Sequence, residues 1–244
     1  MMKILVTGIS GRMGQAVKQA VELNDGTEMA STHDVGQDIA AAMSAADCAI
    51  DFSFHGFTPE LLATAVAQSK PLVIGTTGHT DEERAAIAEA AKQIPIVFAS
   101  NYSVGVNTLF WLTRKATQIL KDYDIEIIEM HHHHKLDAPS GTARTLAEVV
   151  CEETGMDYNK DVMHGREGLV GARPQRQIGM HSMRGGDVVG DHTVMYATDG
   201  ERVELTHKAS SRMTFAGGAV RAALWLADKP AGLYNMQDVL GFND

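Results

Sequence analysis

The chain has 244 residues, of which 44% are hydrophobic and 21% charged, and its formal net charge is −10 at pH 7. This composition supplies enough apolar side chains for one large or two modest domains and excludes global disorder. An acidic chain lacks the basic surface that nucleic acids require, and no run approaches the roughly 18 apolar residues of a membrane span. The two cysteines form neither a disulfide framework nor metal spacing, so we expect a cytoplasmic protein without nucleic-acid or membrane partners.

The first half of the chain alternates between short apolar runs and helical patterns. Strands are predicted over 3–7, 27–33, 48–52, 71–74 and 96–99, and helices over 12–23, 59–68 and 81–93, the last capped by Thr80. These strands are continuous rather than alternating, which is typical of a parallel sheet covered on both faces. The order of elements predicts a doubly wound α/β domain.

The second half has a different pattern. Strands are predicted over 125–130, 192–198 and 202–207, helices over 144–150 and 213–227, long loops over 165–190, and a short tail at the end. Asp199-Gly200 is a strong hairpin signal between the last two strands. Partial alternation in these strands favours an antiparallel sheet with one exposed face.

A glycine-rich loop joins the first predicted strand to the first predicted helix. It reads Gly8-Ile-Ser-Gly11-Arg-Met-Gly14. Glycine lets the backbone approach a pyrophosphate, and the helix N-terminus presents free N–H groups to it. Because the loop opens a βαβ unit, it predicts a dinucleotide site; a tight turn without a ligand is the alternative.

The end of the second predicted strand should meet the adenosine ribose of such a dinucleotide. A carboxylate there accepts a hydrogen bond from the ribose 2′-hydroxyl and repels a 2′-phosphate, so Asp34 favours NADH. Arg12 could still neutralise a phosphate, and a solvated loop carboxylate is the other interpretation of Asp34. Small residues after two later strands, at 75–78 and 99–102, leave room for the nicotinamide and its ribose, although either could be an ordinary turn.

A histidine run follows the strand predicted over 125–130, in the stretch Glu129-Met-His-His-His-His-Lys135. In an extended chain, His131, His133 and Lys135 would face one way. Imidazole transfers protons near neutral pH and lysine adds positive charge, so the stretch predicts proton transfer beside an anion. Scattered surface histidines are an alternative, and a metal site is less favoured because no cysteine is local.

Asp137-Ala-Pro-Ser-Gly-Thr-Ala143 comes directly after this stretch. Pro139 and Ser140 suit the start of a helix, and the backbone amides of Gly141 and Thr142 in its first turn could hold a carboxylate. An anion site would then lie a few residues from the proton donors. The alternative is a plain capped helix.

The combined pattern Glu129-x-His-His-x-x-Lys135-x-Asp137-Ala-Pro-Ser-Gly-Thr-Ala143 resembles the signature of the 4-hydroxy-tetrahydrodipicolinate reductase family, formerly called dihydrodipicolinate reductases, of the diaminopimelate route to lysine. The resemblance spans nearly the whole chain. It also includes residues 8–14, 50–52, 73–78, 101–107 and 206–215.

The resemblance implies a Rossmann-type doubly wound parallel sheet, to which the C-terminal helix returns, and a central α+β domain with a mixed sheet that builds a homotetramer. We therefore assign residues 1–102 and 212–244 to dinucleotide binding and 103–211 to substrate binding and tetramerisation. The implied reaction is the NAD(P)H-dependent reduction of (2S,4S)-4-hydroxy-2,3,4,5-tetrahydrodipicolinate, a small cyclic dicarboxylate, to tetrahydrodipicolinate with loss of water. No metal is expected.

The same resemblance gives roles to individual residues. His131 is the expected proton donor and acceptor and Lys135 the proton donor, while His132, Gly141 and Thr142 would bind substrate. Residues that would line the cofactor are Gly8, Ile9, Ser10, Gly11, Arg12, Met13, Asp34, Gly75, Thr76, Thr77, Ala99, Ser100, Asn101 and Tyr102. His33-Asp34 stand where many relatives carry an acidic residue followed by arginine, a departure that weakens the expectation of a strong NADPH preference.

Two other functional classes match part of the pattern. A semialdehyde dehydrogenase on this scaffold would need a nucleophilic cysteine over the nicotinamide, and Cys48 and Cys151, in a predicted strand and helix, suit that role poorly. A non-catalytic dinucleotide sensor would keep the glycine loop but would have no use for His131 and Lys135.

Overall fold

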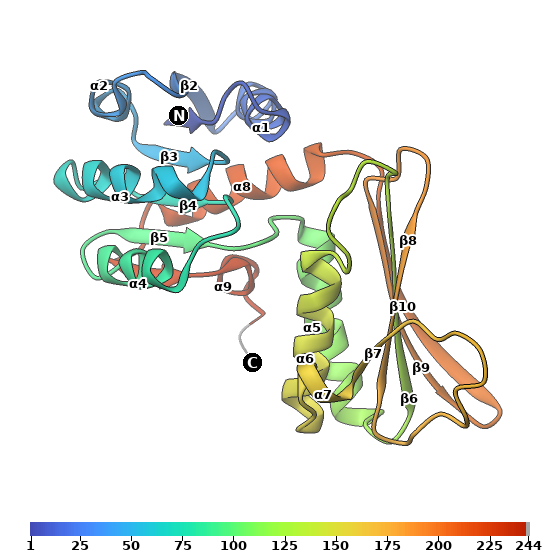
Figure 1. Cartoon of the computed structure of the whole chain (residues 1–244). Helices are drawn as coiled ribbons and strands as arrows, with labels where there is room; N and C mark the ends of the chain where they lie inside the picture. The colour runs from blue at the N-terminus through green and yellow to red at the C-terminus, as the bar shows by residue number, and fades with distance from the viewer. Residues whose placement is uncertain (243–244) are drawn as a thin grey trace. The chain divides into compact units, whose positions relative to one another are not determined.

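The computed structural model describes residues 1–242 and divides the chain into two compact units (Figure 1). Met1–Val104 and Arg212–Asp244 form the first unit, and Gly105–Ser211 forms the second. These divisions lie within two residues of the boundaries expected after residues 102 and 211. Residues 243 and 244 of the expected first domain lie outside the described residues, and the roles given to the two domains stay predictions.

The first unit is built on a parallel six-stranded sheet in the order β11-β5-β4-β3-β1-β2. Its strands are β1 (Met2–Thr7), β2 (Thr27–His33), β3 (Cys48–Asp51), β4 (Leu72–Ile74), β5 (Pro95–Phe98) and β11 (Gly232–Tyr234). Its helices are α1 (Arg12–Glu22), α2 (Ile39–Ser44), α3 (Thr58–Ala67), α4 (Asp81–Ala90), α8 (Met213–Leu226) and α9 (Met236–Leu240), with a 3₁₀ turn η1 (His55–Phe57). The strand order reverses next to β1, which places a ligand crevice at the carboxyl ends of β1 and β3.

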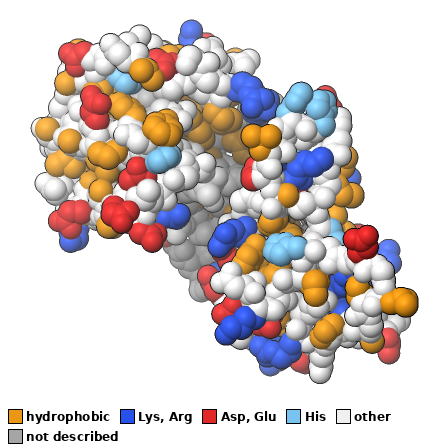
Figure 2. Space-filling view, viewed as in Figure 1, with side chains coloured by type: hydrophobic (Ala, Val, Ile, Leu, Met, Phe, Trp, Pro, Cys, Tyr) orange, Lys and Arg blue, Asp and Glu red, His pale blue; other side chains and the backbone are white. Residues whose placement is uncertain are grey.

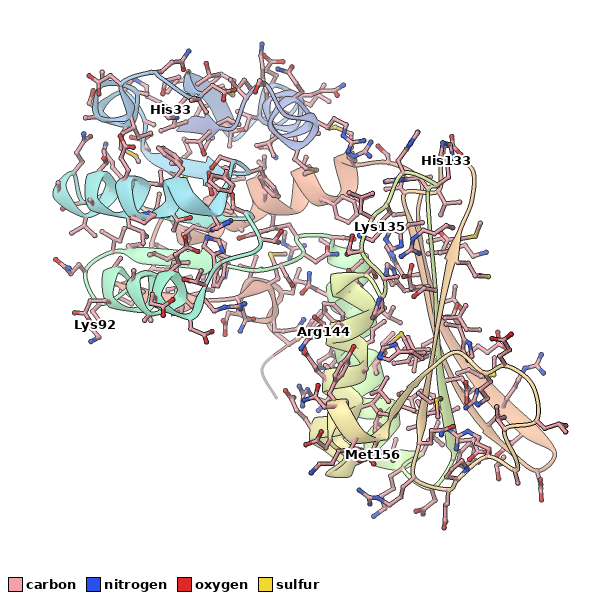
Figure 3. All side chains as sticks on the ribbon, in the orientation of Figure 1. His33, Lys92, His133, Lys135, Arg144 and Met156 are labelled. Carbon is pink, nitrogen blue, oxygen red and sulfur yellow. The ribbon has the colours of Figure 1, made fainter. Side chains whose placement is uncertain are left out.

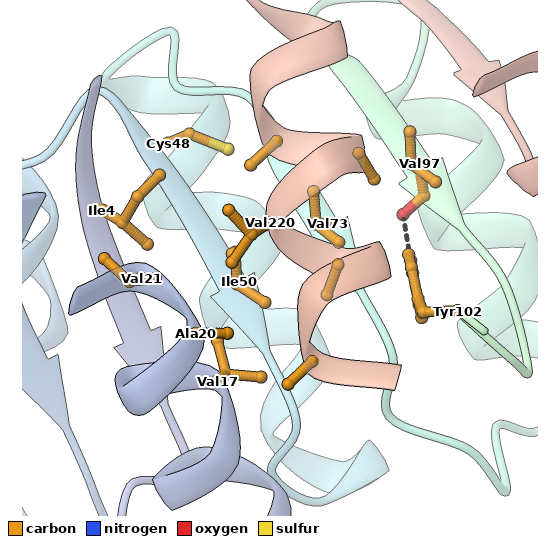
Figure 4. Packing of buried hydrophobic residues seen from close by; sticks show 14 of the residues in the cluster. Ile4, Val17, Ala20, Val21, Cys48, Ile50, Val73, Val97, Tyr102 and Val220 are labelled. Atoms are coloured by element: carbon orange, nitrogen blue, oxygen red, sulfur yellow. Dashed lines mark hydrogen bonds between the residues drawn. The ribbon is translucent and has the colours of Figure 1, made fainter. Parts of the chain in front are cut away.

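Apolar clusters cover both faces of this sheet. Ile4 and Ile50 pack with α1 and α8 on one face (Figure 4), whereas Leu5 packs with α2 and α3 on the other. Tyr102 is buried in the first cluster, where its hydroxyl donates to the backbone oxygens of Val97 and Ile74. Successive apolar residues of β1, β3, β4 and β5 alternate between these two clusters. The central strands are therefore covered on both sides, as the continuous apolar runs predict.

The second unit is a mixed five-stranded sheet in the order β10-β9-β6-β8-β7. Its strands are β6 (Asp124–His131), β7 (Val162–His164), β8 (Ile178–Arg184), β9 (Gly190–Thr198) and β10 (Glu201–Ala209), and its helices are α5 (Val104–Ile119), α6 (Gly141–Thr154) and α7 (Tyr158–Asp161). The three helices lie on one side of the sheet (Figure 1), where Ile125, Ile127 and Val194 form its core. The hairpin predicted at Asp199-Gly200 joins β9 to β10. The parallel sheet of the first unit and the mixed sheet of the second confirm the predicted fold class.

The sequence interpretation missed several elements. It gave no helix over Val104–Ile119, because this helix opens with valine, glycine, asparagine and threonine, which are weak helix formers. The loops predicted over 165–190 contain β8, in which a Cβ on Gly179 would lie 1.7 Å from a Glu126 carboxylate oxygen, so a larger residue there would displace that side chain. The predicted tail contains β11 and α9.

Within residues 1–242, no helix combines the length and the apolar character needed to cross a bilayer.

Candidate active site

The glycine loop turns sharply between β1 and α1. Gly8 has φ +70°, and a Cβ on it would lie 2.3 Å from the backbone oxygen of Phe52. A Cβ on Gly14 would lie 2.1 Å from the Gly8 oxygen. Gly11 precedes α1 and has no side chain with which to cap the first amides of the helix. The loop therefore keeps its backbone close to β3 and leaves the start of α1 open to an anion.

A cavity of about 680 Å³ opens at this end of the sheet. Gly8, Ser10, Gly11 and Asp34 line it, as do residues that the sequence interpretation did not single out, among them Phe57 and Glu60. No lysine or arginine of the described chain lines the cavity, which carries two carboxylates. The volume is in the range of small-molecule and cofactor sites.

Asp34 connects two loops at the edge of this cavity. Its Oδ2 accepts a hydrogen bond from the Ser10 amide at 2.7 Å, and its Oδ1 accepts one from the Val35 amide at 2.9 Å. Hydrogen bonds from Ser10 and Val35 lower the pKa of Asp34, so the carboxylate is charged at neutral pH. Asp34 is thus a fixed negative charge rather than a freely solvated one.

The other predicted cofactor residues occupy neighbouring positions in the first unit. Ile9 and Met13 pack against the first apolar cluster, and Arg12 is exposed at the start of α1. Residues 75–77 follow β4 and residues 99–102 follow β5, the next strands in the sheet. The side chain of Tyr102 points into the core, so only its backbone could face a ligand.

In the second unit, the inward face of the sheet changes from apolar to polar along β6. Ile125 and Ile127 belong to the core, whereas Glu129 and His131 are buried polar residues at the carboxyl end of the same face. His192 on β9 lies opposite Glu129 in the strand register, and its ring meets the His131 ring edge-on at 5.2 Å between centroids. One end of the sheet therefore gathers titratable side chains under the start of α6.

Glu129 is the best-connected group of this cluster. Its Oε2 lies 2.6 Å from His131 Nδ1, and both of its oxygens accept hydrogen bonds of 2.9 Å from the Arg184 guanidinium. Its Oε1 also accepts a bond of 3.2 Å from the Ser140 amide. Burial raises the pKa of Glu129, but hydrogen bonds from His131, Arg184 and Ser182 outweigh burial and lower it to about 2.

The histidine run does not continue β6 as an extended chain. β6 ends at His131, where the His132 amide donates to the Val188 oxygen at 2.7 Å and the Lys135 amide donates back to the His132 oxygen at 3.1 Å. The predicted alternation of His131, His133 and Lys135 is therefore wrong beyond His131. Figure 3 labels His133 and Lys135 on this loop, and Figure 2 shows histidine and basic side chains gathered there. Lys135 Nζ contacts Asp137 Oδ1 at 2.9 Å.

α6 begins at Gly141, as its cap chemistry predicts. Ser140 is the N-cap, and its Oγ accepts a hydrogen bond from the Ala143 amide. Gly141 is exposed, and a Cβ on it would meet no heavy atom within 4 Å, so there is room beside the first amides of the helix. The open end of α6 can hold an anion next to the Glu129 and His131 cluster.

His192 completes the cluster as a neutral group. Burial, with a smaller effect from His131, lowers the pKa of His192 to about 3. Its Nε2 lies 3.0 Å from Ser140 Oγ. The sequence interpretation assigned no role to His192 or Arg184, because only strand pairing brings them to Glu129. No set of three or more histidine, cysteine or acidic side chains within residues 1–242 could hold a metal ion.

Family models for the N-terminal and C-terminal parts of dihydrodipicolinate reductase match residues 2–102 and 105–240. The chain belongs to the dihydrodipicolinate reductase family. A 4-hydroxy-tetrahydrodipicolinate reductase of Akkermansia muciniphila is 67% identical over 244 residues, covering 100% of this chain and 99% of the relative. The same enzyme of Cupriavidus metallidurans is 49% identical over 263 residues, covering 98% and 99%.

Solved structures show the same fold. A dipicolinate-bound dihydrodipicolinate reductase from Paenisporosarcina sp. TG-14 has a TM-score of 0.78 at 24% identity and covers 98% of both chains. Together with the sequence relatives, these matches confirm the predicted family, fold class and reductase activity. The chain is an NAD(P)H-dependent oxidoreductase that acts on a small molecule.

Proposed function

We propose that the chain reduces (2S,4S)-4-hydroxy-2,3,4,5-tetrahydrodipicolinate to tetrahydrodipicolinate, with loss of water. Curated relatives that match the whole chain carry the name of this reductase. The observation that carries the proposal lies at the polar end of the second sheet. There, one continuous segment supplies His131 at the end of β6, Lys135 in the loop that follows, and the open start of α6. A dicarboxylate needs amides and cations to bind, and its reduction needs a positioned acid.

Each group of this segment has a proposed role. The amides of Gly141 and Thr142 bind one substrate carboxylate at the N-terminus of α6, and His132 contacts the substrate. His131 and Lys135 hold and deliver the proton that completes the reduction. The nicotinamide supplies the hydride when it is bound. Lys135 rests against Asp137 through a partly exposed ion pair, which a substrate carboxylate can replace at little cost.

The cavity of the first unit is the proposed cofactor site. The start of α1 and the glycines at 8 and 11 suit the pyrophosphate, and the loops after β4 and β5 suit the nicotinamide end. Asp34 and Glu60 give the cavity a negative lining without a lysine or arginine among its described residues. This lining favours the ribose hydroxyls of NADH over the 2′-phosphate of NADPH.

We further propose a cytoplasmic homotetramer assembled through the second sheet. The helices of the second unit lie on one face of this sheet (Figure 1). The opposite face presents a strip of apolar side chains from three strands: Ile128 and Met130 of β6, Met183 of β8 and Met195 of β9. A second copy of the chain would cover this strip.

The proposed reaction is tested with the purified enzyme. Aspartate semialdehyde, pyruvate and the synthase that condenses them are supplied, and NADH consumption is followed by absorbance. Synthase-dependent oxidation of NADH or NADPH is expected, and no consumption with either cofactor rejects the proposal.

The roles of the proton donors are tested by alanine substitution. His131→Ala and Lys135→Ala should each lower kcat by about 100-fold, within the range for general acid–base catalysis. NADH affinity should be unchanged. His133→Ala is the matched control, because the His133 ring lies against His134 on the outer part of the same loop. Normal turnover of His131→Ala or of Lys135→Ala would remove that residue from the mechanism.

A further inference from the structure

The carboxylate of Glu129 is fully buried, and the contacts on it come from three elements of the second unit. His131 lies on the same strand, Arg184 and Ser182 on β8, and Ser140 at the start of α6. Arg184 binds both oxygens in a fork, which balances the charge of the buried carboxylate. These hydrogen-bond donors hold the Glu129 carboxylate in one orientation.

These contacts decide which nitrogen of His131 carries a proton. An ionised carboxylate only accepts hydrogen bonds, so the Nδ1 that lies 2.6 Å from Glu129 Oε2 must be the N–H donor. Nε2 is then the atom that gains or gives up a proton. A Cβ on Gly190 would lie 3.0 Å from Nε2, so glycine at this position keeps the space beside Nε2 open.

The same carboxylate also reaches the groups around the substrate site. Its Oε1 accepts the Ser140 amide, and Ser140 caps the helix whose next two amides are those of Gly141 and Thr142. Arg184 donates a second set of bonds, including one of 2.7 Å to the backbone oxygen of Asp137, the residue that contacts Lys135.

We infer that Glu129 is a positioning residue, whose buried carboxylate holds the His131 imidazole with its proton on Nδ1 and fixes the start of α6 beside it. The inference rests on the proposed roles of His131 and the α6 amides. The inference adds that the Glu129 side chain, with Arg184 as its counter-charge, sets the spacing between His131 Nε2 and the amides at the start of α6.

The test is Glu129→Gln. An amide at this position loses one of the two Arg184 bonds in either orientation, because its NH₂ then faces a guanidinium N–H. If the NH₂ lies on the His131 side, it also donates to Nδ1 and reverses the histidine tautomer. We expect kcat to fall about 100-fold, as when general acid–base catalysis is lost, while the Kd of NADH stays unchanged. Turnover within twofold of the wild type, per folded enzyme, would overturn the inference.

Glu126→Gln is the matched control. Glu126 lies on the same strand, faces the opposite side of the sheet, and is bound by arginine and histidine side chains as Glu129 is, in this case by Arg166, Arg173 and His181. Its loss should destabilise the fold in a similar way but leave kcat per folded enzyme unchanged. An equal fall in kcat for both variants would reduce Glu129 to a structural role and overturn the inference.

A second measurement does not require a variant at Glu129. In the wild-type enzyme labelled with ¹⁵N-histidine, the neutral His131 ring should show the Nδ1–H tautomer, with the signal identified by its absence in His131→Ala. An Nε2–H tautomer would overturn the inference. The proposed function and the inference fail on different results. An active His131→Ala enzyme would remove the proton donor from the proposed function. An inactive His131→Ala enzyme together with an active Glu129→Gln enzyme would reject only the inference.

Discussion

Thr76 Oγ1 donates a hydrogen bond of 2.5 Å to Asp51 Oδ2 and accepts one of 2.9 Å from the Ser53 amide. Asp51 is fully buried, and its other oxygen accepts the hydroxyls of Thr7 and Ser53, each at 2.5 Å. One carboxylate thus joins the carboxyl ends of β1, β3 and β4. The Thr76 hydroxyl is already engaged there, so its proposed role toward the cofactor would come through the position of its loop.

Removing this hydroxyl should loosen the loop that follows β4. Thr76→Val keeps the shape of the side chain but leaves the buried Asp51 without one donor, at a cost of about 1–3 kcal/mol of unfolding free energy. We also expect weaker NADH binding. Thr76→Ser keeps the hydroxyl and should behave like the wild type. Denaturant unfolding and fluorescence titration with NADH measure both effects; equal behaviour of the two variants would contradict this account.

Cofactor choice should depend on Asp34. Replacing it with asparagine keeps an acceptor for the Ser10 amide but removes the charge that repels a 2′-phosphate. We expect the ratio of kcat/KM for NADPH to that for NADH to rise several-fold, mainly through KM for NADPH. Steady-state kinetics with both cofactors measures the ratio. A wild-type enzyme that strongly prefers NADPH would contradict the role given to Asp34.

Stability in acid should depend on Glu126. Burial raises the pKa of Glu126, but hydrogen bonds from Arg166, His181 and Arg173 outweigh burial and lower it from 4.5 to about 2. Because the unfolded chain binds this proton more readily, the carboxylate contributes its full stability above about pH 4.5 and loses it as the pH falls toward about 2.

The pH dependence of this stability can be measured by comparing the wild type with Glu126→Gln. Wild-type protein should be more stable than Glu126→Gln at about pH 6, and the difference should shrink steadily below about pH 4.5, because the neutral amide has no charge to lose. Denaturant unfolding of both proteins across this range measures the difference. A difference that stays constant down to the acid end would show that the Glu126 contacts do not depend on its charge.

Much of this architecture could be predicted from local sequence. The central strands of the first unit, β1, β3, β4 and β5, are short and largely apolar runs. Thr80 does cap α4, with Glu83 in a capping box. Ser140 caps α6 as its position before Gly141 indicates. These features depend on neighbours in sequence, so pattern and propensity suffice.

The rest depends on contacts between distant residues. Arg184 lies 55 residues from Glu129 in the chain and reaches it only because β8 pairs with β6 in parallel. The turn at His132 is set by its bond to Val188, which no local pattern announces. The start of α5 has poor helix formers, and the helix is held instead by the packing of Val106 and Leu109 on the sheet.

The open face of the second sheet supplies the last prediction. Ile128 faces away from the core formed by Ile125 and Ile127, in the apolar strip with Met195 of β9. Ile128→Lys would place a charge in the middle of this strip, where a partner chain would have to bury it, so we expect the proposed tetramer not to form. Light scattering coupled to gel filtration measures the mass. Val170→Lys is the control, because Val170 is an exposed apolar residue outside the sheet. A monomeric wild type, or an Ile128→Lys protein that keeps the wild-type mass, would show that this face does not build the assembly.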